Sequence, residues 1–150
     1  MKHSEQAAAL FCNGCNCAQA VFAAFCDVTG MERENALRLS SSFGAGMGRM
    51  RETCGAVTGM FMVLGMVYGF DDKCENAEKG AHYARVQALA AAFREKHGTI
   101  KCSELMAGLN KDTSPMPELR TPEYYKVRPC VRFVITAAEL LDDYLEKNPK

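Results

Sequence analysis

The chain has 150 residues, a length typical of one compact domain with a sizeable core. Hydrophobic residues make up 48% and charged residues 24%, which excludes an intrinsically disordered chain. Eighteen basic and 18 acidic residues cancel, and this argues against nucleic acid or an anionic membrane as the main partner, because both need a basic face. We therefore expect a single globular domain over residues 1–150.

Helical patterns and turn residues predict an all-α fold, a compact bundle of about five to seven helices. Asn13-Gly14 is a turn dipeptide, and Asn16 is placed to cap the helix that follows it. Glycines four residues apart, such as Gly55 and Gly59, let a neighbouring backbone approach closely. The expected helices cover residues 4–11, 17–26, 32–43, 54–68, 75–96 and 102–107, with a last helix that begins at Pro129.

Two stretches carry further expectations. Residues 108–128 lack a helical period and contain three prolines, so we expect a Pro-rich loop there. In the helix over residues 75–96, alanines repeat near the helical period, at Ala77, Ala81, Ala84, Ala88 and Ala92. His82 in this helix and His97 directly after it are expected to be solvated, because charged residues surround them.

The eight cysteines are the unusual feature of the composition. The first residues lack the apolar run of a secretory signal, and the most apolar stretch, residues 56–70, is shorter than the roughly 20 residues that cross a bilayer. We therefore expect a cytoplasmic protein without a membrane span. Cytoplasmic thiols are kept reduced, which leaves redox catalysis, metal ligation or apolar packing as uses for the cysteines.

Four cysteines fall in the first turn of an expected helix, where free N–H groups and the helix dipole favour a thiolate. Basic residues lie near three of them in sequence, among them Arg49, Arg51, Lys101, Arg128 and Arg132. A lowered thiol pKa and a reactive or ligating role are therefore predicted, with small buried hydrophobic residues as the alternative. The four are Cys17, Cys54, Cys102 and Cys130.

The other four cysteines carry weaker signals. Cys12 and Cys15 form Cys-x-x-Cys-x-Cys with Cys17, but no second pair at matching spacing supports a metal or redox motif. They are therefore extra ligands, an extra dithiol or packing residues. Cys26 ends an apolar helix and is expected in the core, and Cys74 lies beside acidic residues, so neither receives a role.

Two other segments, residues 44–51 and residues 124–130, each add a minor alternative. The glycine-rich residues 44–48 can form a small anion-binding nest together with Arg49 and Arg51. Tyr124 and Tyr125 precede Arg128 and either line an entrance to Cys130 or pack the loop.

The cysteine segments resemble a known family. Residues 54–59 read Cys-Gly-Ala-Val-Thr-Gly and match the CGAxxG motif of the C_GCAxxG_C_C family of redox-active proteins, while residues 16–21, 93–105 and 128–130 resemble its other cysteine segments. The resemblance extends over about residues 10–145, and the four family cysteines map onto the four at helix starts. The resemblance implies a redox role and a gene that lies near transporter genes. It also implies a relation to split-Soret cytochromes, whose cysteines are thought to hold an iron–sulfur centre.

Three functions remain open at this stage. The first is a thiol oxidoreductase in which two of the four cysteines alternate between dithiol and disulfide, with Cys54 as nucleophile and a redox partner or small thiol as substrate. The second is a four-cysteine site for zinc or an iron–sulfur cluster. The third is a non-enzymatic interaction module that serves a transporter. Gly- and Ala-rich apolar faces also suggest a homodimer.

Overall fold

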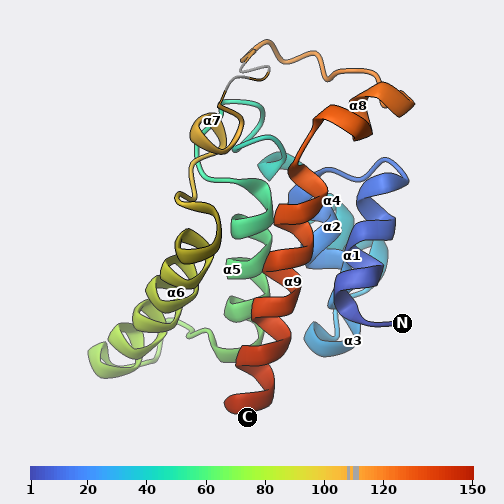
Figure 1. Ribbon diagram of the computed structural model, residues 1–150. Coiled ribbons are helices and arrows are strands. Elements are labelled where there is room, and N and C mark those ends of the chain that lie inside the picture. The colour runs from blue at the N-terminus through green and yellow to red at the C-terminus, as the bar shows by residue number, and fades with distance from the viewer. Residues whose placement is uncertain (108, 110–111) are drawn as a thin grey trace.

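The computed structural model describes residues 1–107, 109 and 112–150. The fold is all-α, as predicted (Figure 1). Within the described residues the helices are α1 (His3–Cys12), α2 (Cys17–Ala24), α3 (Cys26–Thr29), α4 (Arg33–Ser40), η1 (Ser41–Phe43), α5 (Gly55–Tyr68), α6 (Asn76–His97), α7 (Cys102–Leu105), α8 (Pro122–Val127) and α9 (Cys130–Lys147). None of the helices in this part of the chain combines the length and apolarity needed to cross a membrane.

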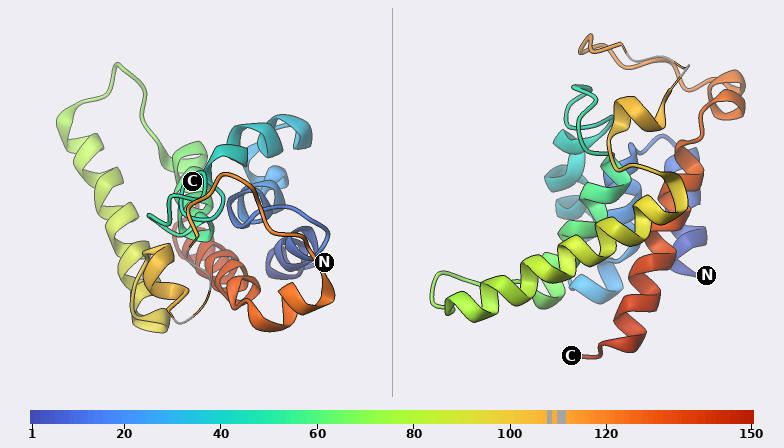
Figure 2. Two further views of the ribbon diagram at one scale, coloured as in Figure 1. Left: turned by 90° about the horizontal axis from the view of Figure 1, so that it is seen from above. Right: turned by 60° about the vertical axis from the view of Figure 1, so that its left-hand side comes forward.

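Helices α2, α5 and α9 pack against one another, and α1 covers α2 and α9. The core between them contains fully buried aromatic and aliphatic side chains, including Phe11, Phe22, Val57, Leu64 and Leu141. Helices α5 and α9 begin at the end of the bundle drawn at the top of Figure 1, where α7 and α8 also lie. Residues 112–121 run across this same end (Figure 2), and we call them the overlying segment.

The glycines of α5 explain how closely it approaches α2. A Cβ atom on Gly59 would lie 2.9 Å from the carbonyl oxygen of Ala18 and 3.0 Å from Cβ of Val21. By contrast, a Cβ atom on Gly65 would meet nothing within 4 Å. Close approach therefore depends on the first glycines of α5, while Gly65 lies on the exposed side of the helix.

The predicted helix over residues 17–26 is interrupted in the structure. Helix α2 ends at Ala24, the fully buried Phe25 takes a non-helical conformation, and α3 follows until Gly30 ends it in a left-handed conformation. The predicted helix over residues 32–43 likewise ends early at Ser40, and its last residues form the 3₁₀ turn η1.

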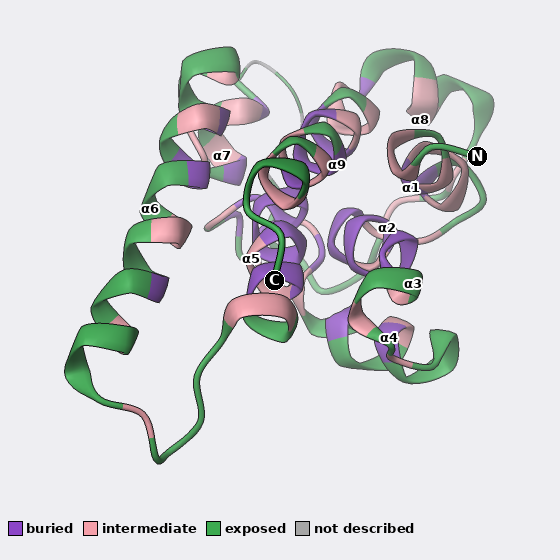
Figure 3. Cartoon of the chain, turned by 90° about the horizontal axis from the view of Figure 1, so that it is seen from below, coloured by how far each residue is buried: buried purple, intermediate pink, exposed green. Residues whose placement is uncertain are grey.

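The expectation that both histidines of α6 are solvated is wrong. His82 is buried against the ring of Phe70, and His97 Nε2 lies 2.8 Å from Thr136 Oγ1 of α9. The buried face of α6 consists of His82, Leu89, Ala90 and Phe93, and it is oriented toward the bundle (Figure 3). Four of the five repeating alanines face solvent instead and the fifth is half-buried, because the larger side chains on the other face fill the space beside α5 and α9.

The prediction of a loop over residues 108–128 is wrong for residues 122–127, which form α8. Thr121 caps this helix by accepting a hydrogen bond from the backbone N–H of Tyr124 at 3.2 Å, and Pro122 occupies the first helical position. Thr-Pro-Glu is thus a helix start and not a loop element. Residues 108 and 110–111 of the predicted loop lie outside the described residues.

Candidate thiol site

The four cysteines singled out from the sequence lie at helix starts in the structure. Cys17, Cys102 and Cys130 are the first residues of α2, α7 and α9. Cys54 was expected inside the first turn of α5 but is the residue that precedes it. Burial raises the pKa of the Cys54 thiol, and the backbone N–H groups of Val57 and Ala56, which still face its sulfur, act against that rise.

A short pairing of two backbone segments places Cys54 beside Cys102. The N–H of Cys54 donates to the carbonyl of Ile100 at 2.7 Å, and the N–H of Cys102 donates to the carbonyl of Glu52 at 2.6 Å. These bonds flank an isolated antiparallel bridge between Thr53 and Lys101. The starts of α5 and α7 are therefore held together although 48 positions separate the two cysteines in the sequence.

Cys17 lies against the first turn of α5. A Cβ atom on Gly55 would come within 2.8 Å of Cys17 Sγ and 3.0 Å of the Ala18 backbone nitrogen, so only glycine fits there without displacement. The start of α2 is fixed by the predicted cap. Asn16 Oδ1 accepts from the N–H of Gln19 at 2.9 Å, and Gln19 Oε1 accepts from the N–H of Asn16 at 3.0 Å, which is a reciprocal capping box.

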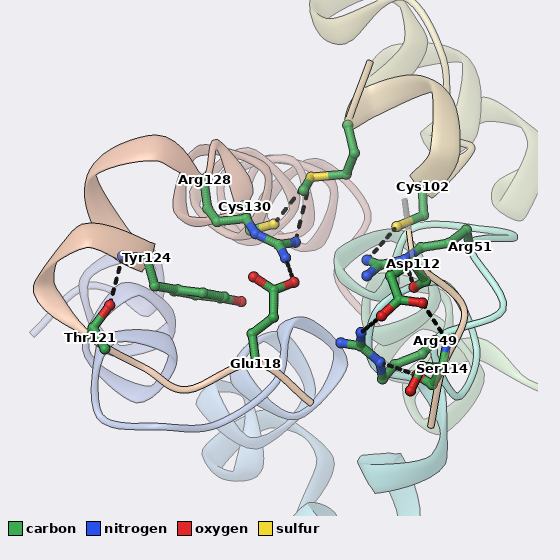
Figure 4. A network of polar contacts seen from close by, with 11 residues as sticks. Arg49, Arg51, Cys102, Asp112, Ser114, Glu118, Thr121, Tyr124, Arg128 and Cys130 are labelled. Atoms are coloured by element: carbon green, nitrogen blue, oxygen red, sulfur yellow. Dashed lines mark hydrogen bonds and ion pairs between the residues drawn. The ribbon is translucent and has the colours of Figure 1, made fainter. Parts of the chain in front are cut away.

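All four cysteines line one cavity of about 130 Å³ beneath the overlying segment. Aromatic and apolar side chains form much of its wall, among them Phe11, Leu105, Met106, Tyr124 and Phe133. Charged groups complete it, namely Arg120 and, as Figure 4 shows, Arg49, Arg51, Glu118 and Arg128. The sequence separates these residues widely, and the shared end of α2, α5, α7 and α9 brings them together.

The prediction of a lowered thiol pKa is wrong for Cys54, Cys102 and Cys130. Burial raises the pKa of Cys54 well above its ordinary value, raises that of Cys102, and raises that of Cys130 to about 12. The neighbouring Cys17 adds to the rise at each of the three, because two negative charges so close repel. Loss of water thus outweighs the helix N-termini, and these three thiols are protonated at neutral pH.

Two arginines act against this rise, at Cys102 and Cys130. Arg51 Nη1 lies 3.8 Å from Cys102 Sγ, and the Arg128 guanidinium lowers the pKa of Cys130. Arg128 itself forms an ion pair with Glu118. Cys54, which the sequence favoured as nucleophile for its nearby arginines, instead has Cys17 and Cys130 as the charged neighbours that act on it.

Arg120 and Met106 of the cavity wall carry no signal in the sequence, whereas Tyr124 was expected either to line an entrance to Cys130 or to pack the loop. Arg120 of the overlying segment donates to the carbonyls of Phe11 and Cys15, both at 3.1 Å, and its guanidinium lies over the rings of Phe11 and Tyr124. Met106 Sδ accepts from Cys130 Sγ at 3.8 Å. Tyr124 lines the cavity, and burial raises its pKa to about 12. Such contacts join distant segments, so spacing along the chain could not reveal them.

The remaining cysteines lie outside the cavity wall. Cys12 is exposed, and Cys15, Cys26 and Cys74 are half-buried. All eight cysteines are free thiols in this structure. Burial is the largest cause that raises the pKa of Cys15 and of Cys26.

The cavity cysteines offer the donor chemistry of a zinc or iron–sulfur site, but their arrangement does not match one. Among the described residues, no group of three or more His, Cys, Asp or Glu side chains is placed to hold a metal ion. A zinc or iron–sulfur site at Cys17, Cys54, Cys102 and Cys130 stays a prediction.

A family model described as "Putative redox-active protein (C_GCAxxG_C_C)" matches residues 15–144, a range that contains all four cavity cysteines. No curated protein and no solved structure matches the chain.

Proposed function

The chain belongs to the C_GCAxxG_C_C family of redox-active proteins, and we propose that it is a thiol oxidoreductase whose cavity cysteines alternate between dithiol and disulfide. One observation carries this proposal: four thiols line the same small cavity, three of them buried and Cys130 half-buried. A cluster of thiols that served packing alone would not need arginine contacts, yet Arg51 contacts Cys102 and Arg128 acts on Cys130.

Cys17 is the partner that we propose for disulfide formation. Among the cysteines, it has the largest electrostatic effect on each of Cys54, Cys102 and Cys130. Cys17 Sγ also lies against Gly55, the residue that follows Cys54, and this contact supports Cys17 as the thiol that reacts with another cavity cysteine.

Cys102 is the nucleophile that we propose in place of Cys54. A thiolate must form inside a site that disfavours charge, and Arg51 Nη1 faces Cys102 Sγ, where it stabilises the negative sulfur. In the reaction, the Cys102 thiolate attacks a substrate disulfide, and one substrate thiolate leaves and takes up a proton. Cys17 then loses its proton and attacks the Cys102 sulfur, which releases the second substrate thiol. Two electrons pass from the protein dithiol to the substrate.

Anaerobic purification followed by thiol counting tests this proposal. We expect that a neutral disulfide, hydroxyethyl disulfide, removes two thiols per chain, and that peptide mapping finds Cys17 in the new bond. Cys17→Ser should abolish this bond, whereas Cys74→Ser, a matched change outside the cavity, should leave it intact. An unchanged thiol count in the folded wild-type protein would overturn the proposal.

The same sample decides between the alternatives. Stoichiometric zinc or iron by elemental analysis, lost in Cys17→Ser and kept in Cys74→Ser, would establish the metal centre and refute a simple dithiol. If the protein holds neither a metal nor a reducible disulfide, the non-enzymatic interaction module is the alternative that remains.

A further inference from the structure

Positive charge surrounds the thiol cavity in excess of its counter-charges. Four arginines line it, and of the described lining residues Glu118 is the one acid. Asp112, just behind the wall, adds a second carboxylate, whose Oδ2 lies 3.8 Å from Arg49 Nη2. Four guanidinium groups therefore share two carboxylates. The neighbouring thiols do not make up the difference, because burial keeps Cys54, Cys102 and Cys130 in their neutral form.

Two of the four arginines are fully used by the protein. Arg120 donates to two backbone carbonyls and stacks on aromatic rings. Arg128 pairs with Glu118 and lies over the ring of Tyr124. Neither therefore has an obvious free donor for a ligand.

Arg49 and Arg51 each keep a buried nitrogen without a hydrogen-bond partner among the described residues. Arg51 is only 3% exposed. Its Nε donates to the carbonyl of Asp112 at 3.0 Å and its Nη1 contacts Cys102 Sγ, but its Nη2 has no acceptor. Arg49 Nε donates to the carbonyl of Ser114 at 2.6 Å, while its Nη2 is beyond hydrogen-bond distance of the nearby Asp112 carboxylate. Figure 4 shows the Arg51 guanidinium beside Cys102 and the Arg49 guanidinium beside Asp112 and Ser114.

The backbone holds these two arginines in an uncommon conformation. Arg49 and Arg51 have φ values of 67° and 61°, and Ala45 and Met47 before them are also left-handed. Residues with a Cβ atom adopt this conformation at a cost, and folded proteins keep such residues mostly where a site requires them. Arg49 and Arg51 both line the cavity.

A guanidinium group keeps its charge in a protein, and a buried charged group whose donors lack acceptors disfavours the folded state. We infer that Arg49 and Arg51 bind a small oxyanion in the thiol cavity, and that this anion accepts the electrons of the cavity thiols. The donors of a guanidinium match two oxygens of such an anion. A cavity of about 130 Å³ also has room for a small oxyanion, since a single water molecule needs only about 10–15 Å³ of such volume.

The role of the oxyanion as electron acceptor rests on the thiol chemistry proposed above. It supplies the oxidant that the conversion of two thiols to a disulfide requires. The Cys102 sulfur forms a bond to the central atom of the oxyanion, and one oxygen leaves as water with the two thiol protons. Cys17 then attacks the Cys102 sulfur, the sulfur–central atom bond breaks, and its electron pair remains on the central atom. The products are a protein disulfide, one water molecule and an oxyanion with one oxygen fewer, reduced by two electrons. Arg51 contacts the sulfur that attacks and binds the anion that is attacked.

Binding is tested with inorganic sulfate, which thiols do not reduce, by calorimetric titration of the reduced protein. We expect one site per chain and at least a tenfold weaker affinity in Arg49→Met. Arg94→Met, a matched change on the exposed face of α6, should bind as the wild type does. Glu118→Gln removes a negative charge from the wall and should bind sulfate several-fold more tightly. If sulfate does not bind, or binds equally to Arg49→Met, the anion site is refuted, and equal weak binding to all variants identifies an adventitious ion only.

The acceptor role is tested by comparing arsenate with the neutral hydroxyethyl disulfide as oxidants of the same reduced protein. We expect the ratio of the two oxidation rates to fall at least tenfold in Arg49→Met, because arsenate needs the guanidinium and the neutral disulfide does not. Oxidation by the disulfide alone would overturn the acceptor role and leave the thiol oxidoreductase standing. If neither reagent oxidises the wild-type protein, the proposed function itself fails.

Discussion

Replacing Gly59 with alanine tests the packing that brings the first turns of α2 and α5 together. The added methyl group would lie 2.9 Å from the carbonyl oxygen of Ala18 and 3.0 Å from Cβ of Val21. Both atoms belong to the backbone or to the root of a side chain, so neither can move aside without shifting α2 against α5. Since Cys17 begins α2 and Cys54 immediately precedes α5, such a shift would also separate two cavity thiols.

Two opposing effects set the change in the free energy of unfolding of Gly59→Ala. Alanine is favoured over glycine inside a helix by about 1 kcal/mol. Forcing an extra methyl group into a well-packed core costs about 1–3 kcal/mol, and contacts with immobile atoms place Gly59 at the upper end. The free energy of unfolding should therefore fall by about 2 kcal/mol, which lowers Tm by roughly 4–8 °C for a chain of this size.

Gly65→Ala is the matched control in the same helix, because nothing lies within 4 Å of its added Cβ atom. Only the helix preference of alanine over glycine remains there, so the free energy of unfolding should rise by about 1 kcal/mol. Denaturant unfolding followed by far-UV circular dichroism measures both variants, and the rate at which Cys17 forms a disulfide measures the effect on the site. A Gly59→Ala protein as stable as Gly65→Ala would refute the close-approach argument.

Three further predictions concern other parts of the molecule. His3 lies 2.7 Å from Asp142 Oδ1 and 2.9 Å from Asp27 Oδ1 and stacks on Phe25, so His3→Ala should lower the free energy of unfolding by about 1–2 kcal/mol; an unchanged denaturation midpoint would contradict this. Burial lowers the pKa of His97, so the unfolded chain binds its proton first, and stability should fall as pH drops below the ordinary histidine pKa of about 6.5. His97→Gln should reduce that loss in unfolding curves measured across this range, and an identical pH profile would count against it. Iodoacetamide at neutral pH should modify the exposed Cys12 at least tenfold faster than Cys102, whose pKa is raised by burial; peptide mass spectrometry over time measures both rates, and equal rates would show that the cavity thiol is accessible and ionised.

Protonated thiols change how the redox site is expected to work. A buried thiol reacts only after it loses its proton, and in this cavity the charge of a thiolate is best compensated at Cys102, beside Arg51. Selectivity among oxidants would then depend on which of them enter the cavity and change the charge around Cys102. This differs from an exposed, low-pKa cysteine, which reacts with any oxidant that it meets.

Local sequence signals determined the helices and the positions of the cysteines on them. Asn16 and Gln19 form the capping box at Cys17, and Gly98 ends α6 in a left-handed conformation. Both depend on residues within a few positions of one another, as does the start of a helix after Thr121, which the prolines of the segment obscured. The all-α fold and the family motif were likewise predictable from the sequence, because short-range patterns specify them.

Tertiary structure alone decided which face of α6 is buried, which α5 glycines touch a neighbour, and how the thiols ionise. His82 and Leu89 pack inward although alanines repeat elsewhere on the helix. The thiol pKa values rise because residues from distant segments exclude water from the cavity. A helix N-terminus is a local property that the sequence reveals, whereas desolvation depends on every segment that covers the site, and at these cysteines desolvation is the larger effect.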